Sequence, residues 1–383
     1  MKNLYLISVI LLAFVAGIFS TELQAGNEQR VGSNGASELQ INPWARSSGW
    51  GDANVSCVVG VEAMYQNIAG MAMTPKSEFM FTNTQWLVGS GVVVNSGGFA
   101  TKVGETGVMG VMVLNQNFGE IDITTDALPE GGIGTFKPSY SVIGLGYARE
   151  FSNSIFGGIT VKMINENIFN AKASGFAIDA GIQYVTGLGK DKAGNRNRDN
   201  LKFGITMKNV GSTMKYTGDG LSFMGTSSNG TVMTVEHRAQ EFEMPSLIKI
   251  GFSYSFRLAP KVDAVSETVS SDHNLIIAAN FTANSFTKDQ LHFGMEYGFR
   301  NLFFLRGGYI YEKDIIGKNS ALRSTAFTGP TAGMSLQVPV NKENKSVMAI
   351  DYSYRFTNPF RGVHTFGVRI TLGAKSDSGS SRL

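Results

Sequence analysis

The sequence predicts an all-β protein, a transmembrane antiparallel β-barrel of about fourteen strands. Three observations carry this prediction. Segments of about ten residues alternate between apolar and polar side chains. Residues 1–25 have the layout of a secretory signal peptide. The chain is also rich in glycine and poor in charge, with 46 Gly, 9 Pro and 16% charged residues, which is typical of many strands joined by turns.

The N-terminus predicts export. Lys2 is followed by an almost unbroken apolar run over 4–19, and Ala25 offers a small residue at the cut, so the mature chain is expected to begin at Gly26. The run is shorter than the roughly 20 residues that span a bilayer comfortably, which makes an uncleaved anchor the weaker interpretation. No cysteine follows the cut at once, which argues against a lipoprotein. The formal net charge of +3 suggests no nucleic-acid partner.

The alternation is clearest over 247–256 and 363–373, where one face is aliphatic or aromatic and the other polar or glycine. A tilted strand of about ten residues crosses a bilayer, whereas strands of a soluble sandwich are commonly five or six residues long. Lys249 and Arg369 lie on the polar faces. Each would cost roughly 2–4 kcal/mol at mid-depth if it met lipid. A soluble sandwich is the alternative that the pattern leaves open.

The long links also fit a barrel of even strand number. If the first strand rises from the periplasm, the links near 118–138, 211–244 and 313–323 lie outside. Links 188–199 and 258–271 are longer than ordinary periplasmic turns, which indicates a miscounted strand or a docking feature. No later segment approaches 18 uninterrupted apolar residues, so no transmembrane helix is expected. The expected strands lie near 77–87, 89–102, 104–117, 139–151, 154–168, 173–187, 200–210, 245–257, 272–283, 289–300, 302–312, 324–338, 346–357 and 363–373.

The segment before the barrel has a different pattern. Residues 26–37 are polar and expected to be flexible, and 61–71 are expected to form a short helix ended by Gly70. Small residues here would let the backbone pack closely inside a lumen, and a surface arm is the alternative. The expected organisation is a signal peptide over 1–25, a flexible N-terminus and hatch over 26–76, the barrel over 77–373 and a polar tail over 374–383.

Charges on the polar strand faces are expected to point into the lumen. A mutually neutralised network that closes the interior is favoured over a conduction path. The mixed signs favour neither an anion pore nor a cation pore. The expected lumen-facing charges are Asp179, Lys202, Lys208, Lys249, His292, Glu296, Arg306, Asp351, Arg355 and Arg369.

No catalytic, metal or cofactor site is expected, and the protein is not expected to be an enzyme. His292 and Glu296 share a strand face but lie about 13 Å apart, too far for one ion. Residues 191–199 resemble a calcium loop only weakly, because they lack its glycine and distal glutamate, so a solvated turn is favoured. No Gly-x-Ser-x-Gly elbow or P-loop appears. None of the histidines is at metal-ligand spacing to another or to Cys57: His237, His273, His292 and His364.

Two motifs before the barrel point to a family. Residues 45–53 read ARSSGWGDA, and 65–70 read YQNIAG. At these residues the chain resembles the PorV/PorQ family of Bacteroidota, relatives of the FadL-type transporters, whose patterns are A-R-S-x-G-M-G-x-A and N-P-A-G. Trp50 and Ile68 depart from them, standing where the family has methionine and proline. Further similar stretches extend the resemblance over 39–254: 119–127, 173–181 and 211–216.

The resemblance implies a FadL-like barrel of fourteen strands in the outer membrane of a Gram-negative bacterium, with a small N-terminal hatch inside the lumen. It implies outer-membrane lipid as a partner and an accessory role in type IX protein secretion, by binding secretion-system proteins or cargo C-terminal domains. The alternative is passive transport of a hydrophobic small molecule. The hatch residues it singles out are Trp44, Arg46, Trp50, Asp52 and Asn67.

The two functions differ in what they require of the lumen. Transport calls for a continuous apolar pocket behind the hatch, around Trp44, Trp50 and Met64. A charged, dry and blocked lumen argues against transport.

Overall fold

The structure is a computed structural model that describes residues 30, 32–190, 194, 197–262, 269–313, 315, 326–341, 345–358 and 360–373. The expected signal peptide and the expected polar tail lie outside these residues, as does most of the weak calcium-loop candidate. No helix among the described residues is long and apolar enough to cross a membrane.

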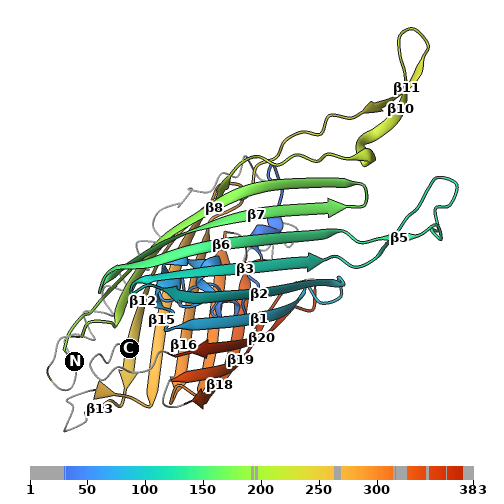
Figure 1. Ribbon diagram of the computed structural model, residues 1–383. Helices are drawn as coiled ribbons and strands as arrows, with labels where there is room; N and C mark the ends of the chain where they lie inside the picture. The colour runs from blue at the N-terminus through green and yellow to red at the C-terminus, as the bar shows by residue number, and fades with distance from the viewer. Residues whose placement is uncertain are drawn as a thin grey trace.

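Fourteen antiparallel strands close into one barrel, which confirms the predicted fold class (Figure 1). The first strand pairs with the last, from Ser77↔Leu372 to Gln85↔His364, so the sheet has no open edge. The barrel strands are β1 (Ser77–Trp86), β2 (Val92–Val103), β3 (Gly107–Asn117), β6 (Ser139–Ser152), β7 (Ile155–Ile168), β8 (Ala171–Thr186), β9 (Leu201–Gly211), β12 (Leu247–Leu258), β15 (His273–Asn284), β16 (Gln290–Phe299), β17 (Phe303–Glu312), β18 (Gly329–Asn341), β19 (Ser346–Arg355) and β20 (Val363–Leu372).

The outward faces of these strands are apolar and exposed. Leu145 on β6 and Ile182 on β8 are 65% and 58% exposed, and their neighbours along each strand alternate with buried side chains. A soluble sandwich would bury this face, so exposure of aliphatic residues around a closed sheet indicates contact with lipid. The alternation that predicted the strands therefore also separates a lipid face from a lumen face.

The two ends of the barrel differ. Two hairpins project far from one end, which we call the outer end, and β6, β7 and β8 extend in the same direction (Figure 1). The opposite, inner end carries the links 187–200 and 259–272, and the second of these holds a two-stranded ladder. The barrel closes with fourteen strands without either link, and the described residues of the two links contain no barrel strand. The additional strands are β4 (Ile121–Asp122) and β5 (Thr135–Phe136), β10 (Ser222–Thr226) and β11 (Val232–Glu236), and β13 (Lys261–Val262) and β14 (Val269–Ser270).

The predicted helix over 61–71 is wrong in its extent. Two short helices replace it because Asn67 is extended, with φ −156°, and its side chain caps the second by accepting from the Ala69 amide. Gly70 lies inside the second helix, where a Cβ would come 2.0 Å from the Val58 carbonyl oxygen, so close packing requires the glycine. The helices before the barrel are η2 (Ser37–Gln40), α2 (Ala45–Gly49), α3 (Ala63–Gln66) and η3 (Ile68–Met73), and η4 (Asp219–Leu221) precedes β10.

Candidate functional site

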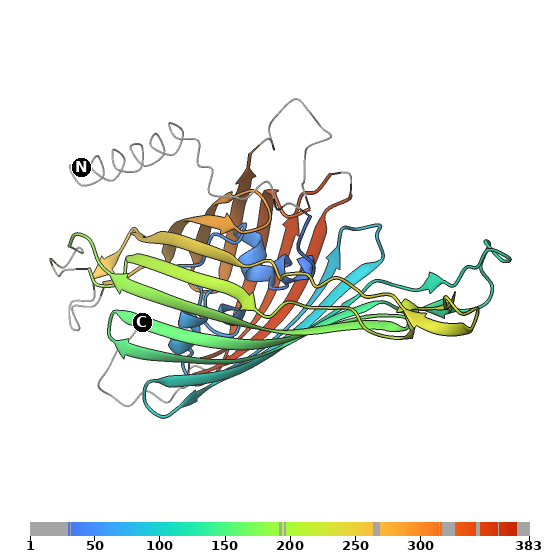
Figure 2. The same cartoon turned by 90° about the horizontal axis from the view of Figure 1, so that it is seen from above.

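The N-terminal segment runs through the barrel from its outer end to its inner end. At the outer end, the Gly35 amide donates to the Glu243 carbonyl at 3.1 Å, and Arg30 pairs with the Glu243 carboxylate at 2.6 Å. Part of the stretch predicted to be flexible is thus held in place. The chain then descends inside the ring of strands before it enters β1 (Figure 2). A small hatch inside the lumen, as predicted, therefore fills the barrel.

Glycines let the hatch touch the wall backbone. A Cβ on Gly308 of β17 would lie 2.2 Å from the carbonyl carbon and oxygen of Trp50. A Cβ on Gly49 would lie 2.9 Å from Cα of Gly333 on β18. These contacts leave no layer of side chains between the hatch and this wall, so any movement of the hatch must break them.

A cluster of buried charges joins the hatch to β16 and β17. Glu296 accepts from Arg306 at 2.5 Å and from the Trp50 indole nitrogen at 3.2 Å, and Arg46 lies 3.7 Å from the same carboxylate. Arg46 is also 3.7 Å from Glu62. Because Glu296, Arg306 and Glu62 are buried and the Arg46 side chain is only 18% exposed, the attraction is poorly screened, and each charge depends on its partners for stability.

Asp52 is the centre of a second polar cluster. Its side chain accepts from Asn42 at 2.5 Å and from Gln66 at 3.0 Å, and Arg355 of β19 lies 3.4 Å away. Lys249 of β12 reaches the same cluster by donating to Gln66 at 3.1 Å. Asp52 adopts a left-handed backbone, with φ 59°, which its short polar side chain tolerates.

Asn67 and Trp44 hold the hatch in other ways. The Asn67 amide donates to the carbonyl oxygens of Val55, within the hatch, and Ile182, on β8, at 3.0 and 3.1 Å. Trp44 is fully buried in an apolar cluster, and its indole nitrogen has no hydrogen-bond partner among the described residues. All five predicted hatch residues thus lie inside the lumen.

A third buried pair lies on the wall at a bulge between β8 and β9. Lys162 pairs with Asp179 at 2.7 Å and also donates to the side-chain oxygen of Asn209, whose backbone N–H donates to Asp179. The register between the strands shifts at Asp179. Lys208, beside this bulge, places its ammonium 3.5 Å from the centre of the Tyr65 ring.

The opposite side of the lumen is apolar. The inward positions of β3 and β6 form an uninterrupted strip, which we call the apolar lane. Its glycines make room for hatch side chains: a Cβ on Gly110 would lie 2.6 Å from the sulfur of Met71, and one on Gly146 would lie 3.0 Å from Ile68. The lane consists of Val108, Gly110, Met112 and Leu114 on β3, paired with Ala148, Gly146, Gly144 and Val142 on β6.

The outer part of the lane is covered by residues 36–41, which we call the outer plug. Leu39 and Ile41 pack there against Leu114 and Val142 within one apolar cluster. The Tyr65 hydroxyl, in the rest of the hatch, donates a hydrogen bond to the Leu39 carbonyl of the plug at 3.0 Å. The plug is thus held chiefly by apolar packing, whereas the hatch below it is held both by apolar packing and by the charged clusters around Glu296 and Asp52.

The Tyr216 hydroxyl lies beside the plug cluster and donates to Glu166. Burial, together with this hydrogen bond, raises the pKa of Tyr216 well above its usual range. The hydroxyl therefore stays protonated and remains a donor at any physiological pH.

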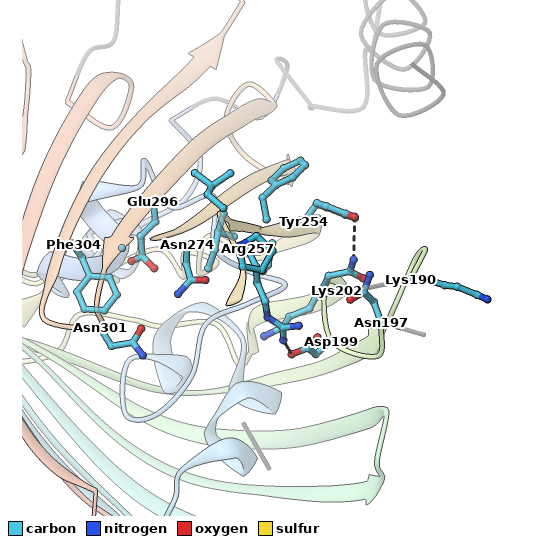
Figure 3. A pocket seen from close by; sticks show the side chains of 17 residues that line it. Lys190, Asn197, Asp199, Lys202, Tyr254, Arg257, Asn274, Glu296, Asn301 and Phe304 are labelled. Atoms are coloured by element: carbon cyan, nitrogen blue, oxygen red, sulfur yellow. Dashed lines mark hydrogen bonds and ion pairs between the residues drawn. The ribbon is translucent and has the colours of Figure 1, made fainter. Parts of the chain in front are cut away.

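A cavity of about 450 Å³ lies at the inner end, between β9, β12, β15 and β16. Lys202, Arg257 and Glu296 face it, and Arg257 pairs with Asp199 at 2.7 Å (Figure 3). Glu296 therefore lies between this cavity and the hatch. Behind the hatch, Trp44, Trp50 and Met64 are at most 1% exposed, so the lumen is closed there in this conformation.

The predicted lumen charges all fall on inward-facing positions. Their partners could not be predicted from the sequence. Asp351 lies 3.7 Å from Arg369 and accepts a hydrogen bond from Ser335, and His292 contacts the Gly51 carbonyl at 2.8 Å. Lys202 lies at the inner mouth, by the cavity, rather than in the lumen centre. Sequence reasoning missed several partners, because they lie in the hatch or were not assigned to a face: Asn42, Glu62, Gln66 and Lys162.

No group of three or more His, Cys, Asp or Glu residues within the described part of the chain is arranged to hold a metal ion. His292 instead contacts Thr282 at 3.0 Å as well as Gly51. Cys57, a free thiol, is partly exposed.

No family model matches the sequence, and no curated protein is significantly similar to it. The PorV/PorQ resemblance therefore stays a prediction. Solved structures similar to the chain include the toluene transporter TbuX of Ralstonia pickettii, with 12% identity, 87% of this chain and 98% of that one covered, and a TM-score of 0.47.

Two further structures are similar at the same level. The toluene transporter TodX of Pseudomonas putida has 12% identity, coverage of 86% and 97%, and a TM-score of 0.48. A FadL homologue of Pseudomonas aeruginosa has 11% identity, coverage of 85% and 98%, and a TM-score of 0.47. At these values the fold class of this chain rests on its own closed strand order.

Proposed function

We propose that this protein is an outer-membrane barrel that lets a hydrophobic small molecule pass along the apolar lane when the outer plug moves. The lane is the observation that carries the proposal. It lies on two paired strands, has no polar side chain from Val108 to Leu114 on β3 or from Val142 to Ala148 on β6, and is covered by hatch side chains. A lumen that only had to be sealed could have charges on this wall too, as β12, β16, β17, β19 and β20 do.

The division of the hatch supports this proposal. Burial of Leu39 and Ile41 stabilises the closed plug by about 1.5–3 kcal/mol each. A hydrophobic solute that takes their place against Leu114 and Val142 recovers much of that free energy. The charged clusters around Glu296 and Asp52 offer no such replacement, so the plug and the apolar side chains over the lane, such as Met71, can move while the charged part of the hatch stays anchored.

The lane can be tested with a single polar side chain. Replacing Val142 with glutamine is expected to reduce uptake of a hydrophobic fluorescent dye about tenfold. A passing apolar solute would displace water from the glutamine amide without replacing its hydrogen bonds, and this desolvation costs about 1–3 kcal/mol. The measurement is the initial rate of N-phenyl-1-naphthylamine fluorescence in intact cells that carry the gene against cells that lack it.

Val113→Gln is the matched control, since Val113 is the lipid-facing neighbour of Leu114 on β3. It is expected to leave uptake within twofold of the unaltered protein at equal amounts of folded barrel. Equal uptake by cells with and without the gene, or an equal rate for both variants, would rule out the lane as a path.

A second candidate function, binding of a protein partner, is favoured by the β10–β11 hairpin. This hairpin projects from the outer end, away from the barrel (Figure 1). Its exposed apolar side chains have no role in closing the lumen. They are Phe223, Met224, Val232, Met233 and Val235. Such a surface fits the cargo-domain binding that the PorV/PorQ resemblance implies.

Changing these five hairpin residues to serine is expected to weaken binding of a purified type IX cargo C-terminal domain at least tenfold, because apolar anchors dominate such interfaces. The binding is measured with the protein in detergent. The control changes the exposed Ile121, Leu128 and Ile133 of the other projecting loop to serine. This candidate is wrong if the unaltered protein does not bind the cargo domain. It is also wrong if the hairpin substitutions leave the affinity for the cargo domain unchanged.

A further inference from the structure

The outer wall changes from apolar to polar along one hydrogen-bonded row of residues. On β6, β7 and β8 the paired side chains Ile143, Met163 and Phe176 are all exposed to the lipid side. The next outward row toward the outer end is Ser141, Asn165 and Ser174. The same step continues round the barrel, where Phe81, Gly97 and Val113 are followed by Asn83, Asn95 and Asn115. A boundary shared by six strands marks the upper limit of the lipid-facing surface.

A pocket lies on the polar side of this boundary, on the outside of the barrel. Its volume is about 550 Å³. The lining residues comprise two lysines, two asparagines, three hydroxyl side chains and one alanine, with no acidic residue. They are Ser141, Asn165, Asn167, Lys172, Ala173, Ser174, Lys215 and Thr217.

One side of the pocket is built by the segment after β9. β9 ends at Gly211, and the chain continues beside β8, where Lys172 and Thr217 exchange two backbone hydrogen bonds of 2.9 Å. Met214 and Tyr216 turn inward to the plug cluster, so the alternate residues Lys215 and Thr217 turn outward. Packing of Met214 and Tyr216 against the plug cluster therefore holds Lys215 at the edge of the pocket.

We propose that this pocket binds the phosphorylated sugar headgroup of a glycolipid in the outer leaflet, with Lys172 and Lys215 at the phosphate. Two ammonium groups without an acidic neighbour in the lining attract phosphate, and amides and hydroxyls hydrogen-bond sugar hydroxyls. The pocket lies one row above Met163 and Phe176, so the acyl chains of the same molecule lie against those side chains. The proposal rests on the outer-membrane location proposed above, but not on transport.

The test uses the full protein in detergent with purified lipid A as the probe, and bound lipid is measured by native mass spectrometry during titration. The unaltered protein is expected to retain lipid A. The double variant Lys172→Gln, Lys215→Gln is expected to bind it about 25-fold more weakly, about fivefold for each lysine near the membrane surface. Lys102→Gln is the matched control. It removes an exposed lysine at the C-terminal end of β2, which lies at the inner end of the barrel, away from the pocket. It is expected to bind like the unaltered protein.

A second titration with inorganic phosphate distinguishes a lipid headgroup from free phosphate. Displacement of lipid A only by phosphate in large excess supports the glycolipid, because the acyl and sugar contacts are then part of the site. Equal affinity for phosphate and lipid A overturns it, as does equal binding by the double variant and the Lys102→Gln control. Uptake of the hydrophobic dye by the double variant is expected to be unchanged, so failure of this proposal and failure of the transport proposal are separable.

Discussion

Replacing Gly308 with alanine is expected to loosen the hatch and open a water-filled path through the barrel. The new Cβ would lie 2.2 Å from the Trp50 carbonyl group, a contact that cannot be kept. Overpacking of this kind costs typically about 1–3 kcal/mol, and the cost falls on the closed state alone, because a displaced hatch no longer meets β17. Each 1.4 kcal/mol is about a tenfold change in an equilibrium constant, so the open population is expected to rise by roughly 5- to 150-fold.

The opening is measured as ion conductance across a planar bilayer and as the labelling rate of Cys57 by a bulky maleimide. Cys57, the chain's one cysteine, lies in the hatch, so the unaltered sequence already contains the reporter. Gly307→Ala is a stringent control, since Gly307 is the next residue on β17 and a Cβ there would meet nothing within 4 Å. If Gly308→Ala and Gly307→Ala conduct and label alike, the hatch is not held against β17 as described.

Removing the Glu296 carboxylate is expected to cause the largest loss of stability. Glu296→Ala would leave the buried Arg306 without its anion, Arg46 with Glu62 alone, and the Trp50 indole nitrogen without an acceptor. Breaking a buried ion pair by removing one partner costs about 3–5 kcal/mol, far more than loss of a surface pair. The measurement is denaturant-induced unfolding in detergent, followed by the gel mobility of the closed barrel.

Two further variants test the cause of that loss. Glu296→Gln keeps an acceptor for Trp50 but no charge, so it is expected to fall between Glu296→Ala and the unaltered protein. Glu236→Ala removes an exposed carboxylate on β11 and is expected to change the unfolding free energy by less than about 0.5 kcal/mol. A loss below about 1 kcal/mol for Glu296→Ala would contradict the buried network.

The barrel could be predicted from the sequence because a strand shows its two faces within ten residues. Strict alternation at 247–256 and 363–373 identified β12 and β20, and parity alone placed Lys249 and Arg369 on the lumen side. Pairing was beyond such reasoning. The contact between Gly49 and Gly333 joins residues that nothing in the local pattern relates.

The hatch was harder to predict for a related physical reason. Its conformation is set by the barrel around it and not by its own periodicity. Asn67 interrupts the expected helix because its side chain bonds to Val55 and to Ile182 on the far wall. Glu62 looks in sequence like an ordinary polar residue of a short helix, yet it is buried beside Arg46.

The path of the N-terminal segment also constrains biogenesis. The barrel closes where β1 meets β20, and the residues just before β1 already occupy the space that this seam encloses. If the barrel closed first, the N-terminal segment would have to pass through a lumen already filled with side chains. Insertion into the membrane is therefore expected to wrap the sheet around the hatch, with the final seam forming last. The hatch, which is synthesised before the barrel strands, is then the core around which the sheet closes.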